Sequence, residues 1–206
     1  MRSRTTLVAL VALSACGSSG KIAPVDGGAE GAAQIPIGAS CTPAAESSPT
    51  FAGFNLGEVT TESNNPTCGD GVCLLNHFQG LTDCPYGQDK AGNPIPPATM
   101  ACTVPGTGQP VAPQNAQTGD AIQPWCADRQ PSAAVYCSCR CANADGRTDD
   151  GATYCDCPGS FTCTQLVSPQ GPADTTAGAY CVEDGTQYDP NLSCAVECDP
   201  TSGSCG

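Results

Sequence analysis

Cysteine is the residue type in this chain whose spacing most clearly indicates chemistry. Seventeen of the 206 residues are cysteines. Six of them fall within residues 136–163, which read Y-C-S-C-R-C-A-N-A-D-G-R-T-D-D-G-A-T-Y-C-D-C-P-G-S-F-T-C. The patterns C-x-C-x-C and C-x-C occur in disulfide frameworks and also in metal–thiolate clusters. Both interpretations are open at this point, although the single histidine, His77, offers little further ligation for zinc or copper.

The other reactive side chains form no catalytic pattern. A serine or cysteine nucleophile needs a neighbouring base, and His77 is the chain's one histidine. No G-x-S-x-G, H-E-x-x-H or phosphate-binding glycine loop is present. The adjacent carboxylates at 149–150 and 183–184 are typical of solvated acidic surface. We therefore predict that the chain is not an enzyme and uses no cofactor.

A calcium site is the alternative that the acidic residues leave open. The sequence Asn143-Ala144-Asp145-Gly146 fits positions 3 to 6 of an EF-hand loop, but positions 1 and 12 would then be Cys141 and Ala152, which are not suitable oxygen ligands. The EF-hand interpretation therefore fails. An irregular, weak site would use three carboxylates of the same loop, Asp145, Asp149 and Asp150.

The elements that would position these residues are two short strands and a turn. Residues two apart lie on one face of a strand. If residues 134–142 and 153–158 are strands, Cys137, Cys139 and Cys141 share one face, and Cys155 and Cys157 share another. The polar residues 143–152 have the composition of a turn. This pattern predicts a cysteine-rich β-hairpin, and one further short strand is expected within residues 51–60.

The amino terminus indicates export. Arg2 and Arg4 precede an apolar run that is about half the roughly 20 residues needed to span a bilayer, as expected of a secretory signal peptide. Leu13, Ser14, Ala15 and Cys16 resemble the lipobox of bacterial lipoproteins. That resemblance implies cleavage before Cys16, lipidation of its thiol and membrane anchoring through several acyl chains. Gly17 stands where the family's inner-membrane retention signal has Asp, so an outer-membrane location is expected, on the periplasmic face or at the cell surface.

Composition excludes some partners and limits the core. Removing residues 1–15 removes two arginines and no acid, so the net charge changes from −13 to −15. Such a charge excludes nucleic acid as a partner, because phosphate binding needs a positive surface. Only about 13% of residues 16–206 are Val, Leu, Ile or Phe, too few for apolar burial alone to offset chain entropy.

Disulfides are therefore expected to hold the fold. Sixteen cysteines remain beside Cys16, an even number in an exported chain. Each disulfide typically contributes about 2–4 kcal/mol. They form groups of six, six and four along the chain, and each group could be bridged internally, but the sequence does not choose among about two million pairings. The candidates are Cys41, Cys68, Cys73, Cys84, Cys102, Cys126, Cys137, Cys139, Cys141, Cys155, Cys157, Cys163, Cys181, Cys194, Cys198 and Cys205.

Two further local resemblances follow from these cysteines. Cys68-Gly69-Asp70-Gly71-Val72-Cys73 resembles the start of short repeats in cysteine-rich surface lipoproteins of myxobacteria, which mostly have no assigned activity. Residues 155–161, C-D-C-P-G-S-F, resemble the closing turn of an EGF-like module, but the spacing to Cys163 departs from that module. We infer only a bridged turn there and no EGF domain.

Taken together, the sequence predicts a small disulfide-rich, loop-dominated protein with short antiparallel β-hairpins and little or no helix. The expected organisation is a signal peptide (1–15), a lipid-anchored flexible tether (16–40), a sparse-cysteine, proline-rich subdomain (41–126) and a cysteine-dense acidic subdomain (127–206). The expected function is non-enzymatic, in envelope structure or interaction. Its expected partners are the membrane, through the lipid, and an unidentified protein or polysaccharide. The alternative is an extracytoplasmic calcium-binding protein.

Overall fold

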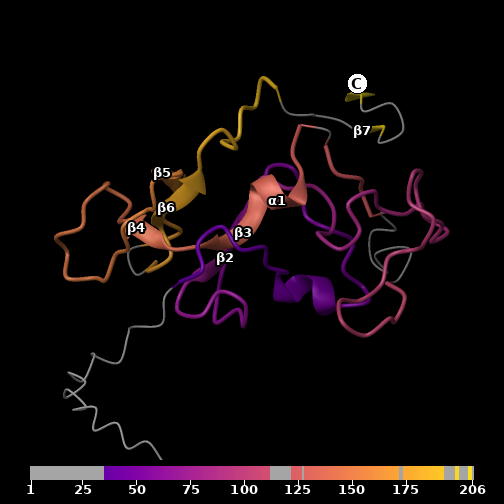
Figure 1. Cartoon of the computed structure of the whole chain (residues 1–206), viewed down its shortest axis with the longest axis horizontal. Coiled ribbons are helices and arrows are strands. Elements are labelled where there is room, and N and C mark those ends of the chain that lie inside the picture. Colours follow the sequence, from indigo (N-terminus) through magenta and orange to yellow (C-terminus); the bar gives the residue numbers. More distant parts are fainter. Residues whose placement is uncertain are drawn as a thin grey trace, which may run out of the picture. The chain divides into compact units, whose positions relative to one another are not determined.

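A computed structural model describes residues 35–111, 122–126, 128–171 and 174–192, and the backbone of residues 198–199 and 204–205. The chain divides into two units, Met1–Ala32 and Ala33–Gly206, and every described residue belongs to the second. The fold class is the predicted one, since small antiparallel sheets are joined by long loops and disulfides (Figure 1). In the described ranges the helical elements are α1 (Pro131–Ala134) and the 3-10 turn η1 (Ala44–Ser47).

The first sheet has the strand order β1-β2-β3 and is antiparallel throughout. Its strands are β1 (Val59–Ser63), β2 (Val72–Asn76) and β3 (Val135–Ser138). The central strand, V-C-L-L-N, is apolar and largely buried, as expected when both neighbours and both faces are covered. The strand predicted within residues 51–60 begins only at Val59, because residues 55–58 form a turn in which Glu58 N–H donates to Asn55 O at 2.9 Å.

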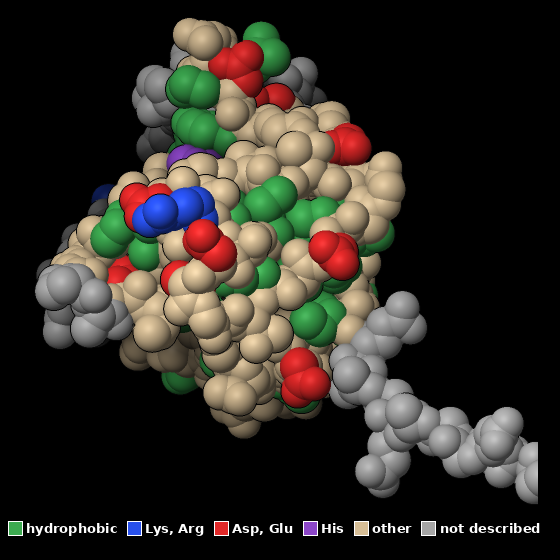
Figure 2. Space-filling view, turned by 90° about the vertical axis from the view of Figure 1, so that its left-hand side faces the viewer, with side chains coloured by type: hydrophobic (Ala, Val, Ile, Leu, Met, Phe, Trp, Pro, Cys, Tyr) green, Lys and Arg blue, Asp and Glu red, His purple; other side chains and the backbone are tan. Residues whose placement is uncertain are grey.

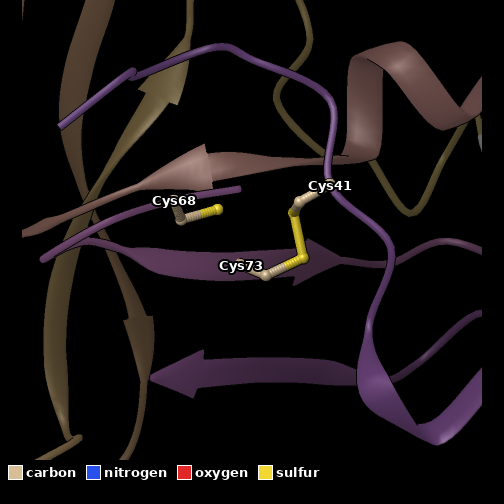
Figure 3. A group of neighbouring side chains, drawn as sticks. All are labelled: Cys41, Cys68 and Cys73. Atoms are coloured by element: carbon tan, nitrogen blue, oxygen red, sulfur yellow. A yellow bond between two sulfur atoms is a disulfide. The ribbon is translucent and has the colours of Figure 1, made fainter. Parts of the chain in front are cut away.

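The core of this sheet combines a few large apolar side chains with disulfide sulfur. Phe54, Leu75, Phe78 and Val135 pack around buried cysteines in one cluster. Figure 3 shows part of that cluster, in which Cys41 reaches across to the cysteine of the central strand while Cys68 lies beside them. Sulfur therefore fills core volume that the short supply of aliphatic residues leaves open.

The second sheet has the order β4-β6-β5, with β4 (Arg140–Ala142), β6 (Gly178–Glu183) and β5 (Phe161–Val167). Its central strand, G-A-Y-C-V-E, is again the most buried of the three. Gly178 begins this strand at φ +144°, where a Cβ atom would lie 2.3 Å from Ala142 O. Glycine is therefore required for β4 and β6 to approach each other.

The predicted cysteine hairpin is wrong in its pairing. The chain leaves the first sheet at the end of β3 and enters the second at β4 after a single residue, Cys139. Strand β4 pairs with β6, and residues 153–158 form no regular secondary structure. One hydrogen bond, from Cys155 N–H to Arg140 O at 3.1 Å, holds that segment against β4. A sequence periodicity of two identifies a face but not the neighbouring strand, and the apolar β6 is the better partner.

The two ranges predicted as subdomains share the first sheet. Strand β2 lies before residue 126 and β3 after it, yet Cys73 and Cys137 are direct register partners across the β2–β3 ladder. Figure 1 shows β2, β3 and α1 next to one another at the centre of the described chain. The long segment between β2 and β3 is thus an excursion from one sheet, and the boundary at residue 126 does not divide the sheets.

Two very short strands, β7 (Cys198–Asp199) and β8 (Ser204–Cys205), form a separate antiparallel pair near the carboxyl terminus. Within the described ranges, no helix has the length and apolarity that crossing a bilayer would require.

Candidate binding site

Twelve of the sixteen candidate cysteines form six disulfides in the described ranges. Two bridges belong to the first sheet and three to the second, and one closes the loop between β2 and β3. The pairs are Cys41–Cys73, Cys68–Cys137, Cys84–Cys102, Cys139–Cys155, Cys141–Cys163 and Cys157–Cys181. The predicted disulfide framework is confirmed to that extent.

Bridging stays within the sequence groups for only four of these pairs. Cys68–Cys137 joins the first group to the second, and Cys157–Cys181 joins the second group to the third. Strand pairing explains why these two bridges join different groups. Cys137 lies on β3, which pairs with β2, and Cys181 lies on β6, the central strand of the second sheet.

The other cysteines are not in any of these six disulfides. Cys126 is buried, with its Sγ 3.1 Å from Oε1 of Gln79. Cys198 and Cys205 are register partners in the β7–β8 pair. Cys16, with its predicted lipid, and Cys194 lie outside the described residues.

A cleft of about 360 Å³ lies where β1, β4 and β6 come together, and it is the strongest candidate for a ligand site. Arg140 on β4 lines this cleft, whereas the next residue, Cys141, belongs to the cluster on the other face of the strand. Cys139, just before β4, belongs to that cluster and also borders the cleft. Hydroxyl groups dominate the polar part of the lining, with one carboxylate and one guanidinium. The lining residues are Ile35, Thr61, Ser63, Asp70, Gly71, Val72, Cys139, Arg140, Thr153, Tyr154, Cys155, Thr175, Thr176 and Tyr180.

The guanidinium of Arg140 is fixed in position but has spare donors. Its Nη1 donates to Thr175 O at 2.9 Å, and its Cζ lies 5.1 Å from the ring centre of Tyr154. The Nε atom is buried without a hydrogen-bond partner. A guanidinium has five N–H donors, so donors remain for a further acceptor in the cleft.

The rest of the lining is ordered by hydrogen bonds. Burial raises the pKa of Tyr180, whose hydroxyl donates to Thr176 O at 2.6 Å and so stays protonated. Asp174 accepts from both N–H and Oγ1 of Thr176, and this lowers the pKa of Asp174 to about 2. The segment that carries Thr175 and Thr176 is thereby held against the cleft.

The acidic loop predicted as an alternative calcium site uses its carboxylates internally. Oδ2 of Asp150 accepts from Nδ2 of Asn143 and from the hydroxyl of Tyr154, and these bonds lower the pKa of Asp150 to about 2. Asp145 pairs with Arg147 at 3.2 Å on the exposed side of the loop. In the described part of the chain, the sets of three or more potential metal ligands that lie within 4.8 Å of one another consist of cysteines, so the loop's three carboxylates are not gathered in this way.

The side chain of His77 packs against other residues of the fold. Its backbone has a positive φ of 57°, its ring stacks on Tyr188 with centroids 3.7 Å apart, and Nδ1 lies 3.0 Å from Leu56 O. Burial lowers the pKa of this imidazole, so the ring is neutral at physiological pH.

The cleft was not predicted from the sequence, although the sequence holds one signal for it. A basic residue between two cysteines, C-R-C at residues 139–141, must point to the face opposite the sulfur atoms if the segment is a strand. In a chain with seven basic residues such a position stands out. Asp70 and Tyr154 gave no comparable signal, because only the folded chain brings β4 against the loop before β2.

These observations define a class, a disulfide-held protein of small antiparallel sheets with a polar cleft between strands. Comparisons with protein-family models, curated proteins and solved structures found no match to this chain.

Proposed function

We propose that this chain is a non-enzymatic lipoprotein, anchored through lipid on Cys16 to the outer membrane, that acts in interactions of the cell envelope. The anchor is supported by the lipobox resemblance of Leu13-Ser14-Ala15-Cys16. An extracytoplasmic location is supported by the six disulfides, which persist in oxidising compartments. A role in binding is supported by the Arg140 cleft.

The ligand class follows from the lining of the cleft. Threonine, serine and tyrosine hydroxyls can exchange hydrogen bonds with sugar hydroxyls, and an arginine donates in parallel to the two oxygens of a carboxylate. We infer that the cleft binds a short saccharide that carries a carboxylate, as uronic acids do. The single observation that carries this proposal is Arg140, positioned by Thr175 and Tyr154 with donors to spare.

The charge of the whole molecule limits this ligand to a short one. A mature chain of net charge −15 repels long polyanions. On the face shown in Figure 2, acidic side chains are scattered among neutral ones. Recognition of an acidic sugar must therefore be local to the cleft.

Isothermal titration of the full chain with trigalacturonate tests the proposal, with a neutral trisaccharide as the reference ligand. We expect Arg140→Gln to lose about 1.5–3 kcal/mol of binding free energy, roughly a 10- to 150-fold rise in Kd, because a hydrogen bond to a charged group is removed. Arg147→Gln is the matched control, since it removes the same charge from the exposed loop and should leave Kd unchanged.

Three results would overturn the proposal. Equal binding of the acidic and neutral trisaccharides, or equal losses in the two arginine variants, would mean that the cleft does not recognise the carboxylate. New reducing ends in the titrated sample would show that the chain cleaves its ligand, which contradicts a non-enzymatic role.

A further inference from the structure

The second sheet carries six cysteine sulfurs in close contact, and two of these cysteines, Cys139 and Cys155, also border the Arg140 cleft. Three disulfides meet there, Cys139–Cys155, Cys141–Cys163 and Cys157–Cys181. Sγ of Cys181 lies 3.7 Å from Sγ of Cys155 and 3.8 Å from Sγ of Cys139, although it is bonded to neither. Sulfur atoms of different bridges are thus in van der Waals contact.

The six sulfurs divide into two groups of three. Cys139, Cys155 and Cys181 form one group, and Cys141, Cys157 and Cys163 form the other, each with its sulfurs within 4.8 Å of one another. The Cys157–Cys181 bridge joins the two groups. If all three bridges are reduced, every thiol has two others of its own group beside it.

We propose that, when their bridges are reduced, these six sulfurs bind monovalent copper, one ion to each group of three thiolates. A metal at about 2.3 Å from each thiolate holds the sulfurs roughly 3.8–4.0 Å apart, close to the contacts that Cys181 already makes. Each group contains sulfur alone, and soft thiolate ligands suit Cu(I) and zinc. Zinc favours four ligands, and each group supplies three.

A monothiol can serve as the reductant that opens these three disulfides. For each bridge, two molecules of a monothiol give two electrons and two protons to the protein disulfide and leave joined as their own disulfide. Three bridges therefore yield six protein thiols. Binding of copper then displaces one proton from each coordinating thiol, because the thiolate is the metal ligand.

Access to these sulfurs differs from access to the first sheet. Cys155 and Cys157 are half-buried and Cys163 is exposed, so a small thiol and a metal ion can reach each bridge. The comparable group on the first sheet, Cys41 with its two neighbours in Figure 3, is buried within the apolar core. Exposed disulfides are generally the labile ones, so mild reduction should open the second-sheet bridges first.

The test uses the full chain, reduced without oxygen by limiting dithiothreitol and freed of reductant. Alkylation and mass spectrometry of one portion identify the opened bridges. A second portion is titrated with Cu(I) in competition with the chromogenic chelator bicinchoninate. We expect about two retained copper ions per chain, one for each sulfur group, and X-ray absorption at the copper edge should show three sulfur neighbours.

Paired variants locate the copper. Cys139→Ser with Cys155→Ser, and separately Cys141→Ser with Cys163→Ser, should each lower the retained copper from about two ions to about one, because each pair removes two ligands of one group. Cys84→Ser with Cys102→Ser is the matched control, since it removes a bridge outside both groups and should retain both ions. Circular dichroism of each sample, with and without copper, should show recovery of β structure on metal binding wherever reduction has loosened the fold.

The proposal is overturned if bicinchoninate removes all copper from the reduced wild-type chain, or if both paired variants retain as much copper as the control. Retention of zinc in preference to copper would overturn the choice of metal. None of these results depends on saccharide binding at the Arg140 cleft, so this proposal and the proposed function fail independently.

Discussion

At the scale of single residues, Glu46 is a carboxyl group in a buried environment that is unusual for its type. It lies in η1 with no exposed surface. Its Oε1 accepts from the backbone N–H of Thr82 at 2.9 Å, and the Thr82 hydroxyl lies 2.7 and 2.8 Å from the two carboxylate oxygens. Burial raises the pKa of Glu46 to about 7 despite these bonds, and the nearby charge of Asp83 adds to the rise.

This carboxyl makes stability depend on pH. The unfolded chain releases the Glu46 proton near pH 4.5, whereas the folded chain keeps it until about pH 7. The folded state therefore binds more protons between these values, and its stability is full below pH 4.5 and falls as pH rises to about 7. We expect this group to remove on the order of 3 kcal/mol across that window, from the pKa difference.

Glu46→Gln imitates the protonated side chain and should flatten that dependence. Chemical unfolding with intact disulfides at pH 5 and pH 8 measures the effect. The variant should match wild type at pH 5 and exceed its unfolding free energy at pH 8. A variant that loses as much stability as wild type between the two pH values would show that another group is responsible.

At the scale of elements, the sequence predicted the type of structure better than its connections. The alternation in C-S-C-R-C was correctly interpreted as strand, and the prediction of very little helix is confirmed. The partner of that strand was wrong, because periodicity carries no information about which strand lies alongside. The break at Cys139, which sends β3 and β4 into different sheets, also leaves no local signal.

The candidate site was hidden for the same reason. The cleft depends on bringing β1, the loop before β2, β4 and the segment at 174–176 together, and these are far apart in the sequence. Glu46 lies in the polar run A-A-E-S-S, which is typical of an exposed turn, and only its contact with Thr82, 36 residues away, makes it buried. Both the cleft and the burial of Glu46 depend on contacts between residues that are far apart in the sequence.

The bridge Cys68–Cys137 is expected to be the more important of two bridges that can be compared directly. It closes 69 residues and both its cysteines are fully buried beside β2 and β3, whereas Cys84–Cys102 closes 18 residues within a loop. Loop-closure entropy gives about 4 kcal/mol for the first and about 3 kcal/mol for the second. Both bridges remove buried sulfur, so the expected difference comes from the length of the closed loop.

Paired alanine variants measure this difference. Cys68→Ala with Cys137→Ala should lower the unfolding free energy by at least about 1 kcal/mol more than Cys84→Ala with Cys102→Ala. Denaturant unfolding provides the values, after mass spectrometry has established that the other bridges are intact. A larger loss in the Cys84–Cys102 variant would mean that the loop, rather than the first sheet, limits stability.

At the scale of the whole molecule, disulfide sulfur occupies core positions that aliphatic side chains fill in most proteins. Several small clusters, each with at most a few large apolar residues, replace one large core. Buried cysteines belong to three of these clusters, so bridges supply packing as well as cross-links. Disulfides persist in compartments outside the cytoplasm, where thiols are oxidised, so a fold that depends on them is suited to such a compartment. This agrees with the export signal that the first 16 residues resemble.

The proposed anchor requires a lipid on Cys16. Metabolic labelling of cells with a fatty acid analogue should label the wild-type chain and place it in the membrane fraction, because several acyl chains anchor a protein stably. Cys16→Ser removes the thiol that the lipobox resemblance marks for lipidation, and the variant should be unlabelled and either soluble or unprocessed.

Gly17→Asp is the matched control for that experiment. It leaves Cys16 in place and introduces the residue that marks inner-membrane retention in the family that the signal resembles. The variant should therefore be labelled as strongly as wild type but move from the outer-membrane to the inner-membrane fraction on a density gradient. Equal labelling of the wild-type and Cys16→Ser chains would refute lipidation at this position, and an unchanged gradient position of Gly17→Asp would remove the support for an outer-membrane location.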